Sequence, residues 1–316
     1  MKNIYVSDLT VGDDLLNEPF LLQDVIRRET KDGRPYLLTT FRDKTGQLNG
    51  VFWDVPEDVE AWIRPGIVTL VTGRVSSYKN SLQINATDLN PSMTTEMDDY
   101  LPASSRSSKV MIAELRALIA GLDEPWRQLV SKILLDEAFL PRFANAPAAR
   151  VLHHAYVGGL LEHSLSMAGV AEFLAGYYPY VNKSLLLAGV LLHDLGKAME
   201  YDTEAGFEFT DDGRLVGHIV RAVVIIEKAA AELGDISESD LRQLVHLVAS
   251  HHGVQEWGSP VVPKTLEAVL LHQIDMIDSR VQGYFDHLRN NGTTGAWSSK
   301  PSLMFNTDLR KPDGFE

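Results

Sequence analysis

The chain has 316 residues, is 45% hydrophobic and carries a formal net charge of −14 at pH 7. This length suits two domains with sizeable cores, and the acidic charge argues against unspecific binding of nucleic acids. The absence of cysteine excludes disulfides and thiolate metal sites. The longest apolar run, at 185–192, is far shorter than the roughly 20 residues of a membrane span, and the N-terminal residues do not resemble a secretory signal. We therefore expect a cytoplasmic protein without a membrane partner.

Residues 1–90 predict a small β domain. Short segments rich in Val, Ile, Thr and aromatic residues alternate with turn signals at 31–33 and 44–46. The expected strands are 20–28, 35–43, 48–53, 67–78 and 82–88, with a short helix at 56–63 between the third and fourth. Five strands with that insertion are typical of an OB-type barrel.

The remainder of the chain predicts a linker followed by helices. Residues 91–109 are polar and contain two prolines and a serine cluster, which is typical of a linker. From residue 110, apolar residues recur at three- and four-residue spacing. Helices are expected at 110–122, 124–136, 160–177, 183–199, 218–233, 239–250 and 265–289, with Asn182 and Ser237 as N-caps. The prediction is an all-α domain at 110–290 and an irregular C-terminal tail at 291–316.

The helical part also holds a metal-ligand pattern. All ten histidines lie between His153 and His287. Imidazole and carboxylate bind first-row transition metals without thiols. Asp275 is expected in the middle of a helix, where a buried carboxylate is costly unless a partner such as a metal ion compensates it. In chain order, the candidate ligands are His163, His193, Asp194, His218, His251, His252 and Asp275.

The order H…HD…D on helices resembles the HD superfamily of metal-dependent phosphohydrolases. His163, His193, Asp194 and Asp275 match the four shared ligands of that superfamily. His218, His251 and His252 match the additional histidines of its two-metal subgroup. The resemblance implies two divalent ions bridged by Asp194, with Mn²⁺ favoured, although Fe, Co or Zn would also suit these ligands. Whether His251 or His252 binds the metal, or both do, is left open.

A β module joined to such a helical domain resembles the YhaM family of 3′-5′ exoribonucleases. The resemblance rests on GRPYLLTTFRDKTGQLNGVFWD (33–54), HHAYVGGLLEH (153–163), LLHDLGK (191–197), SHHG (250–253) and GSPVVPKT (258–265). It implies hydrolysis of single-stranded RNA, with single-stranded DNA and a homo-oligomer left open. Asp194 and Lys197 would be catalytic. Lys197 lies one turn after His193 and can reach a phosphate beside the metals. The alternative for Lys197 is a favourable cation near a helix C-terminus.

Further residues are candidates for contacting the substrate. His154 and Tyr156 precede a di-glycine, and the alternative for them is a structural role at a helix start. Arg221 lies one turn after His218 and could contact a phosphate. Strand alternation puts Phe52 and Trp53 on opposite faces, so one of them belongs to the core. The barrel candidates are Phe41, Trp53 and Tyr78 for base stacking and Arg74 for the phosphate backbone.

Two other functions remain compatible with the sequence. The first is a small-nucleotide phosphohydrolase in which the β module serves regulation or assembly. The second is a non-catalytic nucleic-acid-binding protein with a structural metal. A complete set of ligands for two metals argues against the second.

Overall fold

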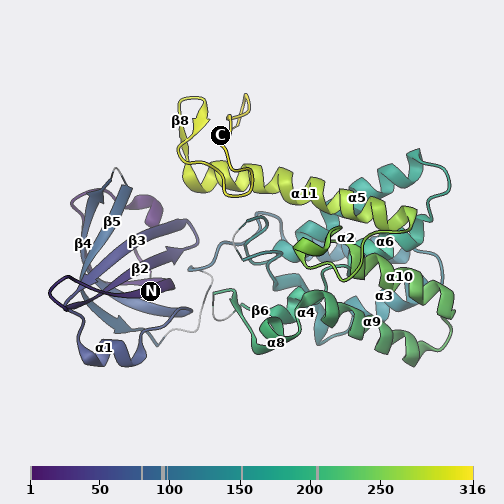
Figure 1. The fold of residues 1–316 in the computed structure, drawn as a ribbon, viewed down its shortest axis with the longest axis horizontal. Coiled ribbons are helices and arrows are strands. Elements are labelled where there is room, and N and C mark those ends of the chain that lie inside the picture. The colour runs from purple at the N-terminus through teal and green to yellow at the C-terminus, as the bar shows by residue number, and fades with distance from the viewer. Residues whose placement is uncertain are drawn as a thin grey trace. The chain divides into compact units, whose positions relative to one another are not determined.

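The structure is a computed structural model, and it describes residues 2–79, 81–93, 97, 99–150, 152–203 and 206–315. The chain forms two compact units (Figure 1). The first comprises Met1–Ala103 and Asp202–Glu208, and the second comprises Ser104–Tyr201 and Phe209–Glu316. The first unit thus extends beyond the predicted domain 1–90 into the predicted linker, and it includes a segment from the middle of the helical half.

A closed barrel forms the first unit, as the sequence predicts. Its strands are β1 (Asp14–Glu29), β2 (Pro35–Asp43), β3 (Gly46–Trp53), β4 (Ile67–Tyr78) and β5 (Ser81–Pro91). The order around the barrel is β1-β2-β3-β5-β4, and β3 and β5 are the parallel pair. The 3-10 helix η1 (Val6–Asp8) precedes the barrel, and α1 (Glu57–Trp62) lies between β3 and β4. Alternate residues of a strand face opposite sides, so Phe41 and Phe52 fill the interior while Trp53 faces outward.

The second unit is largely helical. Its helices are α2 (Ser108–Ala120), α3 (Trp126–Leu134), α4 (Phe139–Asn145), α5 (Gly159–Tyr177), α6 (Lys183–Leu192), α7 (Lys197–Glu200), α8 (Asp211–Leu215), α9 (His218–Leu233), α10 (Glu238–Ser250), η2 (Gln255–Trp257) and α11 (Leu266–Asn291). The predicted N-caps are confirmed. Asn182 accepts a hydrogen bond from the backbone N–H of Leu185 at 3.0 Å, and Ser237 accepts one from Asp240 at 3.1 Å.

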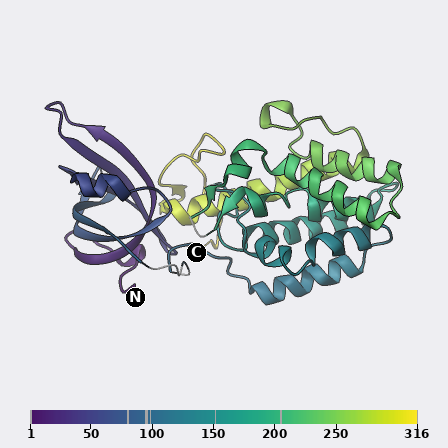
Figure 2. The same ribbon diagram turned by 90° about the horizontal axis from the view of Figure 1, so that it is seen from below.

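Helix α6 is the central element of this unit. Every residue from 184 to 192 is buried, as expected of a helix that is apolar on all sides. It packs against α3, α5, α10 and α11. In Figures 1 and 2, the long helix α11 runs along α5. This packing brings the C-terminal end of α6 close to residues from several other helices.

The structure departs from several predicted boundaries. The helix predicted at 183–199 is interrupted, because α6 ends at Leu192 and α7 begins at Lys197. Helices α4 and α8 were not predicted. Two short strand pairs were not predicted either: β6 (Tyr201–Asp202) with β7 (Glu208–Phe209), and β8 (Thr293–Thr294) with β9 (Trp297–Ser298).

The tail predicted to be irregular is partly ordered by pairing. It contains β8 and β9, Trp297 forms an isolated bridge with Arg310, and Leu309 is buried. In the predicted linker, Tyr100 and Leu101 are buried. Among the helices described, none is both long and apolar enough to cross a bilayer.

Candidate metal centre

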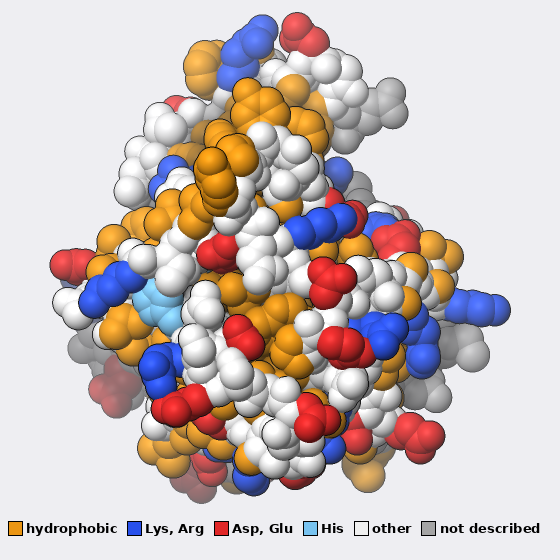
Figure 3. All heavy atoms as spheres, turned by 90° about the vertical axis from the view of Figure 1, so that its right-hand side faces the viewer, with side chains coloured by type: hydrophobic (Ala, Val, Ile, Leu, Met, Phe, Trp, Pro, Cys, Tyr) orange, Lys and Arg blue, Asp and Glu red, His pale blue; other side chains and the backbone are white. Residues whose placement is uncertain are grey.

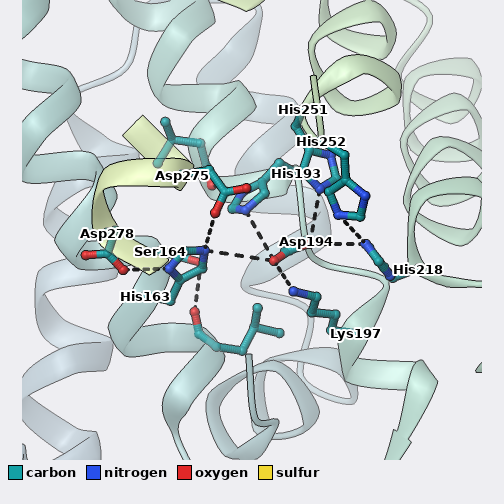
Figure 4. A network of polar contacts seen from close by, with 12 residues as sticks. His163, Ser164, His193, Asp194, Lys197, His218, His251, His252, Asp275 and Asp278 are labelled. Carbon is teal, nitrogen blue, oxygen red and sulfur yellow. Dashed lines mark hydrogen bonds and ion pairs between the residues drawn. The ribbon is translucent and has the colours of Figure 1, made fainter. Parts of the chain in front are cut away.

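Asp194 lies at the centre of the predicted cluster, in the turn that follows α6 (Figure 4). Its Oδ2 atom is 3.3 Å from His193 Nε2 and 3.9 Å from His163 Nε2. Its Oδ1 atom is 3.5 Å from both His218 Nε2 and His251 Nε2. The two oxygens of one buried carboxylate therefore face two separate groups of imidazoles.

The first group comes from three helices. His163 lies in α5, His193 directly follows α6, and Asp275 lies in α11. His163 Nε2 is 3.4 Å from Asp275 Oδ1, and the three side chains offer ligand atoms within 4.8 Å of one another.

The second group consists of His218, His251 and His252. His218 begins α9, and the two adjacent histidines directly follow α10. Their ligand atoms also lie within 4.8 Å of one another, and the Nε2 atoms of His218 and His252 are 3.4 Å apart. Sequence-predicted ligands separated by more than 100 positions thus meet on the two sides of Asp194.

The histidines of both groups are held through Nδ1, which leaves Nε2 facing the cluster. The Nδ1 partners are Asp278 Oδ2 for His163 at 2.7 Å, the Val190 carbonyl for His193 at 2.8 Å, Glu200 Oε2 for His218 at 3.0 Å, the Val248 carbonyl for His251 at 2.7 Å and the Trp257 carbonyl for His252 at 2.7 Å. Four of these contacts are hydrogen bonds, whereas the contact of His218 with Glu200 is an ion-pair contact only. An acceptor on Nδ1 fixes the proton there and presents the lone pair of Nε2 to a metal.

Several polar atoms of the cluster have no hydrogen-bond partner in the part of the chain that the structure describes. Within the described residues, His163 Nε2, His193 Nε2, His251 Nε2 and Asp194 Oδ1 are buried without a hydrogen bond. Buried polar groups are normally paired, because leaving them unpaired costs about 1–3 kcal/mol each. A divalent ion on each side of Asp194 would satisfy these atoms, and a set of imidazole and carboxylate donors suits a first-row transition metal. These buried clusters therefore fit a divalent metal.

Lys197 belongs to the same cluster. Its Nζ atom is 2.6 Å from Asp194 Oδ2, and both side chains are almost completely buried. Burial opposes the charge of each group, but their attraction outweighs it, so the pKa of Asp194 is well below its usual range and the pKa of Lys197 is raised. The pair stays charged inside the protein.

Protonation differs between the histidines. Burial lowers the pKa of His251 to about 4. Burial acts in the same direction on His163, but the neighbouring carboxylates of Asp275 and Asp278 outweigh it and raise the pKa of His163 to about 9.

Gly196 brings the second group to Asp194. A Cβ atom at this position would lie 2.2 Å from the carbonyl oxygen of His218. Only glycine allows the turn after α6 to pass so close to the first residue of α9. The motif LLHDLGK at 191–197 therefore supplies both the ligands and the space that His218 needs.

His154, which the sequence offers as a substrate contact, is buried in the structure. This side chain is 3% exposed, and its ring nitrogens contact Asp278 Oδ2 at 2.9 Å and Tyr156 Oη at 2.8 Å. Tyr156 in turn donates to Glu162 at 3.0 Å. These contacts favour the structural role that the sequence left as the alternative for His154 and Tyr156.

Arg221 is engaged by an ion pair. Its Nε atom donates to Asp212 Oδ2 at 2.8 Å, and a second guanidinium nitrogen contacts the other carboxylate oxygen. A phosphate would have to compete with Asp212 for this side chain.

On the barrel, the prediction for Phe41 is wrong. Its side chain is completely buried and packs against Phe20, with the ring centroids 6.2 Å apart. A base cannot stack on it. Phe41 lies at a position of β2 that faces the barrel interior. The residue type alone does not show which aromatic side chains of a strand face the core.

The other barrel candidates are exposed. Trp53 is 51% exposed and stacks on Tyr36, which the sequence analysis did not single out, at 4.6 Å between ring centroids. Tyr78 is 59% exposed, and the side chain of Arg74 is 67% exposed and close to Asp14. Tyr78 also lines a hollow of about 320 Å³ together with Ile26, Leu38, Asn49 and Gln83.

Asp278 and Glu200 are functional candidates that the sequence analysis missed. Asp278 follows Asp275 by three residues in α11, and Glu200 follows Lys197 by three residues in α7. Residues at this spacing share one face of a helix, which is the signal that could have identified them.

Comparisons with known proteins agree with this architecture. The HD domain model matches residues 160–280, and the model of an OB-fold nucleic acid binding domain matches residues 22–91. The protein named 3′-5′ exoribonuclease YhaM from Geobacillus sp. (strain WCH70) is 33% identical over 92% of this chain and 90% of its own length. Its namesake from Bacillus subtilis (strain 168) is 30% identical over 96% of both chains, and that from Halalkalibacterium halodurans is 32% identical over 96% of this chain and 95% of its own. The chain therefore belongs to the YhaM family, with an N-terminal OB-fold and an HD domain.

Proposed function

We propose that this protein is a metal-dependent 3′-5′ exoribonuclease that shortens single-stranded RNA from its 3′ end. One observation carries the proposal: the two oxygens of Asp194 face two groups of buried imidazole nitrogens. That arrangement suits two divalent ions sharing one carboxylate. The relatives named 3′-5′ exoribonuclease YhaM suggest the reaction and the RNA substrate.

Each half of the cluster would hold one ion. His163, His193 and Asp275 would bind the first, His218, His251 and His252 would bind the second, and Asp194 would bridge them. We favour Mn²⁺, with Fe, Co or Zn as alternatives for the same ligands. Bound divalent ions supply an activated water nucleophile and neutralise the charge of the scissile phosphate.

Lys197 would stabilise the negative charge that develops on the phosphate. Its ammonium already lies 2.6 Å from Asp194, so a phosphate held beside the bridging carboxylate is within its reach. Because the side chain is almost completely buried, its charge is weakly screened by solvent.

The barrel would hold the RNA strand. The stacked pair of Tyr36 and Trp53 and the exposed ring of Tyr78 present aromatic faces to bases. Arg74 would add a contact to the phosphate backbone. On the face of the helical unit in Figure 3, basic side chains alternate with acidic ones and form no continuous basic track. Together with the net charge of −14, this supports binding through stacking more than through unspecific attraction.

The proposal includes a cytoplasmic location, where single-stranded RNA is available. Two points are left open: whether single-stranded DNA is a second substrate, and whether the protein assembles into a homo-oligomer. A DNA oligonucleotide in the assay below and the solution mass of the protein address these two points.

The test is hydrolysis of 5′-labelled single-stranded RNA with Mn²⁺. We expect a ladder of labelled products that shorten progressively from the 3′ end. Turnover of small nucleotides with intact RNA would instead indicate a phosphohydrolase, and binding without turnover would indicate a binding protein. Either result would contradict the proposal. An Asp194→Asn preparation controls for contaminating nuclease.

A further inference from the structure

The two groups of imidazoles are supported in the same way. In each group, one histidine donates its Nδ1 proton to a carbonyl three residues earlier: His193 to Val190 and His251 to Val248. In each group, another histidine has a carboxylate next to Nδ1 instead. These two carboxylates belong to Asp278 and Glu200, and neither faces the space between the groups.

Asp278 supports the first group from α11. Its side chain is 9% exposed, and its Oδ2 atom accepts hydrogen bonds from His163 Nδ1 at 2.7 Å and from His154 Nε2 at 2.9 Å. The hydroxyl of Ser166 donates to the other oxygen. With three donors around it, this carboxylate is fixed in position and holds the ring of His163 in one orientation.

Glu200 supports the second group from the end of α7. Its side chain is 9% exposed, and its Oε2 atom lies 3.0 Å from His218 Nδ1. The backbone carbonyl of Glu200 accepts a hydrogen bond from Thr210 at 3.0 Å. A Cβ atom at Gly213 would lie 2.8 Å from Cγ of Glu200, so α8 packs directly on the stem of this side chain. Glu200 therefore has little freedom to turn away from His218.

We propose that Asp278 and Glu200 are positioning residues, each of which tunes the metal affinity of one half of the centre. Asp278 acts through His163 on the first ion, and Glu200 acts through His218 on the second. A carboxylate beside Nδ1 favours the proton there, orients the ring and makes Nε2 a stronger donor. Asp278 does this through a hydrogen bond with His163, and Glu200 through an ion-pair contact with His218 that is not a hydrogen bond. This inference rests on the proposed two-metal function and adds separate control of the two ions to it.

The test measures Mn²⁺ affinity by calorimetry on full-length protein stripped with a chelator. Asp278→Asn and Glu200→Gln keep the size of each side chain and remove its charge. Each should weaken the binding of one ion about 10- to 100-fold and leave the other within about twofold. Asp286→Asn is the matched control, because Asp286 lies in the same helix and contacts the backbone of His154 but no ligand histidine.

A His218→Ala background assigns the effects to the two ions. This variant should retain only the first ion. Adding Asp278→Asn should weaken that remaining ion, whereas adding Glu200→Gln should leave it unchanged. The opposite pattern would contradict the assignment.

The outcomes separate this inference from the proposed function. A wild-type protein that binds no Mn²⁺ would contradict the function itself. Two ions in the wild-type protein with unchanged affinities in either single variant would contradict the positioning role alone. If only one of the two variants folds correctly, it still tests the positioning role in its own half of the centre.

Discussion

Asp194 is the residue whose carboxylate oxygens face both groups of imidazoles. Replacement by alanine would leave Lys197 buried without its partner, which destabilises a protein by about 3–5 kcal/mol. Asp194→Asn retains a hydrogen-bond acceptor for Lys197 and removes the bridging charge. It is therefore the cleaner test of catalysis.

We expect Asp194→Asn to reduce hydrolysis of RNA about a thousand-fold or more. Charge stabilisation by catalytic metals is worth several kcal/mol, and about 1.4 kcal/mol corresponds to a factor of ten. Turnover is measured with saturating Mn²⁺, and circular dichroism checks that the helices are retained. Near-normal turnover of the folded variant would refute the assignment of Asp194.

Two aromatic residues of the barrel should respond in opposite ways. Trp53→Ala should weaken RNA binding about 5- to 150-fold, because base stacking contributes about 1–3 kcal/mol, and should leave stability nearly unchanged. Phe41→Ala should instead lower the free energy of unfolding by about 3–5 kcal/mol, because it opens a cavity in the core. Binding titrations and chemical denaturation measure the two effects. Equal RNA affinity of Trp53→Ala and the wild type would exclude the stacking role.

At the scale of single residues, the candidate metal ligands could be predicted from the sequence, but the burial and contacts of each side chain could not. His163, His193, Asp194 and Asp275 were predicted as metal ligands because their order resembles that of the HD superfamily. The burial of His154 could not be predicted, because it depends on Asp278, which lies more than 100 positions away in the sequence. Pairing across such distances is a property of the packed helices.

The elements that carry the ligands meet at the turn between α6 and α7. Periodicity predicted one helix over 183–199, since apolar residues continue on both sides of the turn. The structure places residues 193–196 in turns instead. This interruption lets His193 and Asp194 reach the cluster together and brings Gly196 against α9.

Gly196→Ala should disturb this junction. The added Cβ would lie 2.2 Å from the carbonyl oxygen of His218, so the start of α9 has to move. A displacement of about 1 Å at an active site can reduce the rate about 100-fold, and we expect an effect of this order together with weaker binding of one ion.

Gly169→Ala in α5 is the matched control. A Cβ there has no atom within 4 Å, so the substitution should keep full activity and stabilise the helix by up to about 1 kcal/mol. Steady-state kinetics and thermal unfolding compare the two variants. Full activity of Gly196→Ala would show that the close approach to His218 is not required.

The whole molecule consists of a barrel, which we propose binds RNA, and a helical unit, which we propose hydrolyses it. This division was predictable because strand and helix periods differ along the chain. The assignment of Asp202–Glu208 to the first unit was not, since nothing local in that segment indicates which unit it joins. The structure of the C-terminal tail was not predictable either, because it depends on the β-bridge between Trp297 and Arg310.

Removal of metal should separate the two tasks. The proposed ligands all lie in the helical unit, whereas Trp53 and Tyr78, which are proposed to stack on bases, lie in the barrel. After treatment with a chelator, the protein should still bind single-stranded RNA but should not hydrolyse it, and added Mn²⁺ should restore the ladder. Fluorescence anisotropy and the labelled-RNA assay follow both properties in one sample. Loss of RNA binding along with hydrolysis would contradict a binding role that belongs to the barrel.

The number of bound ions tests the central claim most directly. Wild-type protein and His218→Ala are each saturated with Mn²⁺, freed of excess metal, and measured for metal per chain. His218 faces one oxygen of Asp194, on the side opposite His163 and His193. We predict two equivalents in the wild type and one in the variant, which should also lose most of its activity. A single equivalent in both proteins would contradict the two-metal centre.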